Sequence, residues 1–286
     1  MARLSMHRIV AADGFAIECS LYEPFDRRAP PAVVVINSGA GIPRTLYESF
    51  ASWLADCGLS TITYDYRGIG GSRGRSIRGL EASIRDWGSK DCAVVLDWMK
   101  HRFPDAVVHV VAHSIGGVVT GFVSNPPQIG RMVLVSPHIG YWGDYAPSAR
   151  WRMFVLWHVL MPAVTRMAGY FPGRKFGLPE DLPFDVALEW GRRRLRPGRL
   201  PPASRPEQAP RVEASVLTIR PSDDPFATES AMHRVEEFFA RCRFSDFPIA
   251  VAGERPLGHL GFFSKSSREG PWQVARGWLT RGSIMN

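Results

Sequence analysis

Short apolar runs alternate with stretches of helical periodicity along most of this chain of 286 residues. The unbroken β-branched run AVVVIN at 32–37 is typical of a strand buried on both faces, and residues 46–58 have their apolar positions at helical spacing. The same rhythm continues with a strand at 60–66, a long helix near 82–102 and a strand at 106–112. Alternation of this kind predicts a mostly parallel, doubly wound α/β sheet.

The pattern extends toward both ends of the chain. Residues 5–11 and 16–23 predict an antiparallel strand pair around a turn at 13–14. Beyond the middle of the chain the periodicity predicts the following elements: an apolar helix after Ser114, strands at 131–136, 214–219 and 247–252, and helices at 227–241 and near 271–280.

The βα rhythm stops between residues 139 and 208. Four of the nine tryptophans fall in this quarter of the chain, at 142, 151, 157 and 190. We therefore expect a helical cap insertion at 139–208 and a core domain made of 1–138 and 209–286. The longest apolar run, 153–171, is interrupted by a histidine, a proline and an arginine, which favours a buried or interfacial helix pair over a membrane-spanning helix.

Charge and cysteine content narrow the class of protein. The net charge is 35 − 27 = +8, and seven of the arginines lie in the proline-rich stretch 192–211. A solvated linker is the first interpretation of that stretch, with an anionic substrate or a membrane surface as alternatives. No nucleic-acid-binding module is present. Four scattered cysteines and the lack of a signal peptide predict a cytoplasmic protein without an integral membrane segment.

Two serines compete for the role of nucleophile. GGSRG at 70–74 matches the G-x-S-x-G signature literally, whereas AHSIG at 112–116 has Ala112 in the first position. A nucleophile elbow needs a strand that ends at the serine and a helix that begins directly after it. Ser114 meets this condition, and a methyl group is small enough for the position before it. Ser72 lies in a loop rich in glycine and arginine, so Ser114 is the candidate.

The segments AHSIGG at 112–117 and DYRGIGGS at 65–72 together closely resemble the α/β-hydrolase superfamily. The resemblance covers nearly the whole chain and is weakest in the cap. GYFPGRKFG at 169–177 and LPEDLP at 178–183 are also similar to bacterial α/β hydrolases near the serine aminopeptidase and lysophospholipase-like branches. The resemblance implies an α/β-hydrolase fold with a helical cap insertion.

The superfamily also implies a triad in the chain order serine, acid, histidine. PSDDP at 221–225 resembles the family's acid-bearing turn and points to Asp224, with Asp223 as the alternative. His259 stands between a glycine and LGFF, as the family's catalytic histidine does. His113, beside the nucleophile, is expected to pack rather than to react.

An oxyanion hole needs two amide donors. One is expected at Ile115, directly after the nucleophile. The other is expected in the loop 37–43, where related enzymes carry a His-Gly turn and this chain has Ser38 and Gly39. The departure leaves Ala40 as the first choice and Gly39 as the alternative.

These residues predict a cofactor-free serine hydrolase that forms an acyl-enzyme, with a small-molecule carboxylester as the leading substrate. We expect Trp142, Trp157 and His138 to line the substrate pocket. The same triad would serve an aminopeptidase, a thioesterase or an acyltransferase, and a non-catalytic binder of small ligands is a further alternative. No metal-ligand spacing occurs, no nucleic-acid partner is expected, and homo-oligomer formation stays open.

Overall fold

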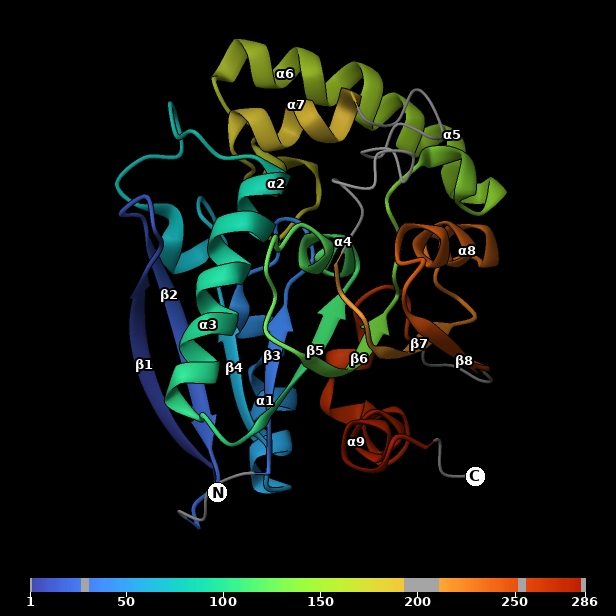
Figure 1. Ribbon diagram of the computed structural model, residues 1–286. Coiled ribbons are helices and arrows are strands. Elements are labelled where there is room, and N and C mark those ends of the chain that lie inside the picture. Colours follow the sequence, from blue (N-terminus) through green and yellow to red (C-terminus); the bar gives the residue numbers. More distant parts are fainter. Residues whose placement is uncertain (1, 27–30, 193–210, 252–255, 284–286) are drawn as a thin grey trace.

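The computed structural model describes residues 2–26, 31–192, 211–251 and 256–283. Residues 193–210, which hold most of the arginine- and proline-rich stretch 192–211, lie outside the described residues. One sheet of eight strands runs through the described part of the chain in the order β1-β2-β4-β3-β5-β6-β7-β8 (Figure 1). Its strands are β1 (Arg3–Val10), β2 (Ala16–Glu23), β3 (Ala32–Asn37), β4 (Ser60–Tyr64), β5 (Val107–His113), β6 (Ile129–Val135), β7 (Ser215–Pro221) and β8 (Arg243–Ile249).

The prediction of a mostly parallel α/β sheet is confirmed. Strands β1 and β2 pair antiparallel with each other, β2 pairs antiparallel with β4, and the pairs from β4 through β8 are all parallel. Strand β8 begins at Arg243, four residues before the predicted start at 247. It is an edge strand with Arg243 exposed and Asp246 paired to Arg220, so its first half lacks the apolar run that marks the inner strands.

Helices cover both faces of the sheet (Figure 1). Side chains of α3, α4 and α8 pack in one apolar cluster, and those of α1 and α9 pack in a second cluster on the opposite face. The core helices are α1 (Glu48–Asp56), α2 (Ile84–Asp86), α3 (Ala93–Arg102), α4 (Gly116–Gly121), α8 (Glu229–Phe238) and α9 (Pro271–Arg281).

A π-helical stretch, Trp87–Cys92, joins α2 to α3 and brings this helix close to α4. A Cβ atom on Gly88 would lie 2.4 Å from the carbonyl oxygen of Val119, so only glycine permits this approach. The short helix that follows Ser114 is thereby held firmly against the core.

The segment 139–192, which follows β6 and is named the cap, lies over the carboxyl ends of the parallel strands (Figure 1). Helix α5 (Pro147–Val155) continues through a π-helical stretch (Leu156–Leu160) into α6 (Met161–Ala168). The predicted helix pair at 153–171 is therefore wrong, because the π-helical stretch accommodates Pro162 without ending the helix. Helix α7 (Phe184–Arg192) packs beneath α6.

Ion pairs attach the cap to the core at two places. Arg73, in the loop after β4, lies 2.8 Å from Asp181, and Arg234 of α8 holds both carboxylate oxygens of Asp144 at 2.6 and 2.9 Å. Each pair joins residues about 90 or more positions apart in the sequence. Among the described helices, none combines the length and apolar character needed to cross a bilayer.

Candidate active site

Ser114 occupies a sharp bend between β5 and α4. Its φ of 56° is one of two positive values among described non-glycine residues. Such strain costs about 1–3 kcal/mol and is found where function holds a residue in place. A Cβ atom on Gly116 would lie 2.5 Å from the carbonyl oxygen of Asn37, so the bend needs glycine two residues after the serine. The side chain thus emerges at the carboxyl edge of the sheet, where α/β proteins bind ligands.

Ser72, the literal signature match, has a structural position. Its Oγ accepts a hydrogen bond of 2.9 Å from the backbone N–H of Glu18 on β2. In the same loop the carboxylate of Asp65 accepts from the amides of Arg44 and Gly71, at 2.6 and 2.9 Å. These contacts shape the segment 65–72 and tie it to the sheet.

The acid and the histidine expected from the sequence come together. His259 Nδ1 and Asp224 Oδ2 are 2.8 Å apart, although the residues are 35 positions apart. The alternative acid, Asp223, instead accepts a 3.0 Å hydrogen bond from the backbone N–H of Gly258. The two neighbouring aspartates therefore hold the same loop in different ways, one at the ring and one at the backbone.

Asp224 is ionised at neutral pH. Burial by itself raises its pKa, but the hydrogen bond and charge of His259, with the amide of Phe226, outweigh it and bring the pKa to about 2. The carboxylate can therefore orient the imidazole and stabilise a positive charge on it throughout the neutral range.

His113 links the loops on both sides of Ser114. Burial, followed by the nearby charge of His259, lowers its pKa to about 3, so the ring is neutral. Its Nε2 donates to the carbonyl oxygen of His259 at 2.9 Å, which leaves Nδ1 to accept from the Tyr47 hydroxyl at 2.9 Å. Sequence reasoning assigned His113 to packing and did not find Tyr47, because both contacts join distant parts of the chain.

The same Tyr47 hydroxyl accepts the backbone N–H of Gly39 at 2.9 Å. This hydrogen bond occupies the Gly39 amide, which favours Ala40 among the two candidate donors. Ala40 lines the cavity at Ser114, and Ile115 directly follows Ser114 at the start of α4.

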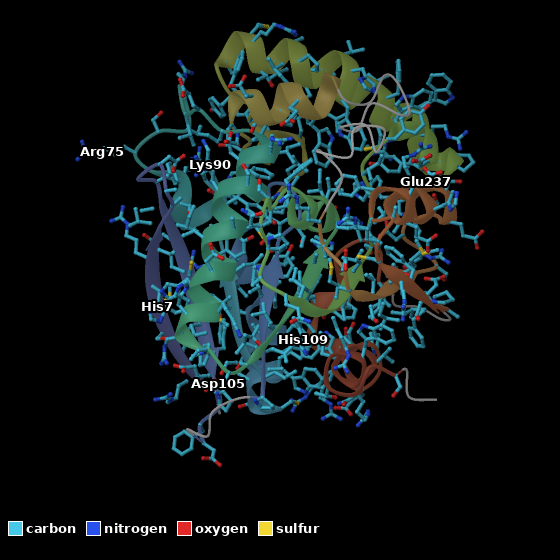
Figure 2. The ribbon with its side chains drawn as sticks, viewed as in Figure 1. His7, Arg75, Lys90, Asp105, His109 and Glu237 are labelled. Atoms are coloured by element: carbon cyan, nitrogen blue, oxygen red, sulfur yellow. The ribbon has the colours of Figure 1, made fainter. Side chains whose placement is uncertain are left out.

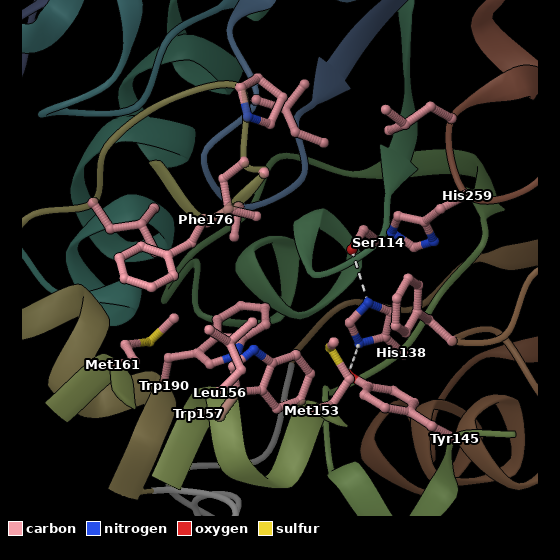
Figure 3. Close-up of a pocket in the computed structure, with 18 residues that line it drawn as sticks. Ser114, His138, Tyr145, Met153, Leu156, Trp157, Met161, Phe176, Trp190 and His259 are labelled. Carbon is pink, nitrogen blue, oxygen red and sulfur yellow. Dashed lines mark hydrogen bonds between the residues drawn. The ribbon is translucent and has the colours of Figure 1, made fainter. Parts of the chain in front are cut away.

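The hydrogen bond of the Ser114 hydroxyl differs from the expected one. Ser114 Oγ lies 2.9 Å from Nε2 of His138, and the Nδ1 of His138 lies 3.3 Å from the Tyr145 hydroxyl (Figure 3). Among the described residues, no hydrogen bond joins Ser114 to His259. The centroids of the two imidazole rings are 5.4 Å apart, and both rings adjoin Ser114.

A cavity of about 310 Å³ opens on these groups. His138 and Trp157 line it, as do cap side chains including Met153, Leu156 and Met161. Trp142, which was expected to line the pocket, is not among the described lining residues. Its ring packs against Trp151 and Phe154 instead.

We also searched the described residues for side chains that could bind a metal ion. In the described ranges, no group of three or more histidine, cysteine, aspartate or glutamate side chains is arranged to hold a metal ion.

Buried histidines make the stability of the fold sensitive to acid. His109, on β5 at the end of the sheet far from the cap, has its pKa lowered to about 4 by burial and by the charge of Arg131 (Figure 2). As pH falls below 6.5, the unfolded chain binds a proton that the folded chain refuses until about pH 4, so stability is lost across that window.

Between pH 6.5 and 4 we expect the free energy of unfolding to fall less in the variant His109→Gln than in the wild type. The difference is up to about 1.4 kcal/mol per pH unit. Denaturant unfolding at several pH values measures this difference. Parallel pH dependences of the two proteins would contradict it.

Comparisons with known proteins identify the family of this chain. The sequence model of the family described as "Serine aminopeptidase, S33" matches residues 28–175, which is just over half of the chain. Mouse and human monoglyceride lipases are 26% and 28% identical over 133 residues, 45% of this chain and 42% of each relative. The chain therefore matches less than half the length of these curated relatives.

Solved structures support the fold. An esterase from Pyrococcus furiosus is 14% identical with a TM-score of 0.62, and the match covers 99% of this chain and 94% of that one. An esterase from Thermogutta terrifontis is 17% identical with a TM-score of 0.58, covering 96% and 98%. At such low identities these likenesses establish the α/β-hydrolase fold alone.

Proposed function

Because the chain belongs to the serine aminopeptidase S33 family of α/β hydrolases, we propose that it is a serine esterase that cleaves small-molecule acyl esters. Ser114 is the nucleophile, His259 the general base and Asp224 the carboxylate that orients it. The observation that carries this proposal is the apolar cavity that opens directly on Ser114 and His259.

In the proposed reaction, Ser114 Oγ turns toward His259, loses its proton to Nε2 and attacks the ester carbonyl carbon. The amides of Ile115 and Ala40 stabilise the oxyanion of the tetrahedral intermediate. His259 then passes the proton to the leaving alcohol, and an acyl-enzyme forms. Water, activated by the same histidine, attacks the acyl-enzyme and releases the carboxylic acid.

The cavity lining favours an ester over an aminoacyl substrate. A free amino terminus is positively charged, and burying it requires a partner of opposite charge. The eighteen described residues that line the cavity include no aspartate or glutamate. Methionine, leucine and tryptophan side chains of the cap instead offer a surface for an alkyl chain. The monoglyceride lipases among the relatives suggest that the alcohol is a small polyol, and their names agree with an acyl ester.

We expect kcat/KM for p-nitrophenyl esters to rise about fourfold for each methylene added to the acyl chain, until the cavity is filled. The reason is that each buried methylene contributes about 0.8 kcal/mol when it leaves water. Initial rates across esters from acetate to dodecanoate measure the trend. Aminoacyl p-nitroanilides, assayed beside them, should react much more slowly.

Two results would count against an esterase. Faster turnover of the aminoacyl anilides than of every ester would favour a peptidase. A complete lack of ester turnover, together with no labelling of Ser114 by a fluorophosphonate probe, would favour a protein that binds its ligand without reaction.

A further inference from the structure

His138 is a polar group in largely apolar surroundings, and the proposed mechanism does not use it. The residue is 4% exposed and follows β6 at the carboxyl edge of the sheet. The rings of Tyr145, Trp190 and Phe226 lie around it, with centroids between 5.5 and 6.4 Å away. Burial of a polar imidazole costs free energy unless the ring is hydrogen-bonded. We therefore ask which function the contact of His138 with Ser114 has.

The surroundings of His138 do not suit a second general base. Its ring nitrogens face two hydroxyl groups, those of Ser114 and Tyr145, whereas Nδ1 of His259 faces a carboxylate. A hydroxyl stabilises an imidazolium far less than a carboxylate does. A positive charge on His259 during the reaction, with ring centroids 5.4 Å apart, disfavours a second charge on His138. We therefore assign His138 a hydrogen-bonding role rather than that of a base.

In any one rotamer, Ser114 Oγ is directed at the imidazole of either His138 or His259. A serine side chain moves between staggered rotamers, and proton transfer to His259 requires a rotamer directed at that ring. In that rotamer Nε2 of His138 gives up its hydrogen bond with Oγ. The loss is unfavourable inside an apolar cavity unless another oxygen takes the place of Oγ.

The acyl part of the substrate lies where it can supply this oxygen. Because His259 protonates the leaving alcohol, the alcohol lies beside that ring. The acyl chain then occupies the rest of the cavity, where Figure 3 shows Leu156, Trp157 and Met161 across from His259. His138 adjoins this side of Ser114, close to the first carbons of a bound acyl chain.

We propose that His138, supported by Tyr145, forms a polar subsite that binds a hydroxyl group on carbon 2 or carbon 3 of the acyl chain. The preferred substrates are then hydroxyacyl esters rather than unsubstituted esters. A hydroxyl group fits either tautomer of His138, since it both donates and accepts. This inference rests on the proposed esterase function and names the substrate class of that site.

The test compares p-nitrophenyl butyrate with its 2-hydroxy and 3-hydroxy analogues. Each kcat/KM is divided by the spontaneous hydrolysis rate of the same ester, which removes the effect of the hydroxyl group on reactivity. The wild type should prefer at least one hydroxy ester by about tenfold or more. The variant His138→Leu should lose about tenfold of that preference, by accepting butyrate better and the hydroxy ester worse.

Two further variants separate recognition from general damage. Met153→Leu changes another lining side chain without changing polarity, and should keep the wild-type preference within about twofold. His138→Gln retains a hydrogen-bonding amide and should keep more of the preference than His138→Leu. If His138→Leu fails to fold, the loss of preference is read from Tyr145→Phe, which removes the hydroxyl behind the imidazole.

The failures of the two proposals are distinguishable. An unchanged ratio of hydroxy ester to butyrate in the His138 variant, or no preference in an active wild type, overturns the subsite and leaves the esterase intact. A wild type that hydrolyses none of the three esters overturns both. If Met153→Leu loses the preference for the hydroxy ester as much as His138→Leu does, then the shape of the cavity sets that preference and hydrogen bonding does not. This result overturns the subsite.

Discussion

Replacement of Ser114 by alanine should lower kcat for p-nitrophenyl butyrate by about a millionfold. The reason is that the proposed acyl-enzyme cannot form without the Oγ atom, and the residual rate comes from binding and from the oxyanion donors alone. The matched variant Ser72→Ala should lower kcat by less than about tenfold. It removes a hydrogen bond from the Glu18 amide, and a single hydrogen bond of this kind contributes about 1 kcal/mol to stability.

Steady-state kinetics on the two purified variants, with circular dichroism to verify folding, measures these effects. Fluorophosphonate labelling followed by peptide mapping gives a second readout, since the label should be found on the peptide that contains Ser114. The assignment of the nucleophile is wrong if Ser114→Ala remains active while Ser72→Ala is inactive.

Replacement of Asp224 by asparagine should lower kcat by about 10⁴-fold while the fold persists. The asparagine amide can donate to Nδ1 of His259, which is 2.8 Å from the carboxylate in the wild type. The ring then keeps its remaining proton on Nε2 and cannot accept one from Ser114. The charge that stabilises the imidazolium is lost as well, so both effects act in the same direction.

Asp223→Asn is the matched control, because it changes the adjacent residue in the same chemical way. Its carboxylate accepts the backbone N–H of Gly258, and an asparagine side-chain oxygen can accept the same hydrogen bond. We expect less than about a tenfold fall in kcat. Equal losses in the two variants, measured under identical conditions, would show that the loop as a whole, and not one carboxylate, supports the reaction.

Most of the framework was predictable because it depends on local pattern. The β-branched run at 32–37 forms β3 with the predicted bounds, and the strand–serine–helix succession around Ser114 forms the predicted sharp bend. Edges and interruptions were less predictable. The polar first half of β8 gave no signal for the first four residues of that strand, and Pro162 suggested a helix end that a π-helical stretch avoids.

The candidate site divides in the same way. The contact between Asp224 and His259 could be expected because a family resemblance supplied their order and their turns. The pairing of Ser114 with His138 had no such signal, since a histidine three residues past a strand has many possible orientations. Trp142 was placed in the pocket on aromatic composition alone, which does not distinguish the inner face of the cap from its outer face.

By itself the sequence determined the α/β succession, the bend at residue 114 and the interruption by the cap, because these follow from periodicity and from small residues at fixed spacing. Only the tertiary structure decided which imidazole holds the Ser114 hydroxyl, how Tyr47 and His113 join the loops, and which cap side chains face the cavity. Such choices depend on side-chain rotamers and on contacts between segments 24 to 146 residues apart, and no local pattern in the chain encodes those distances.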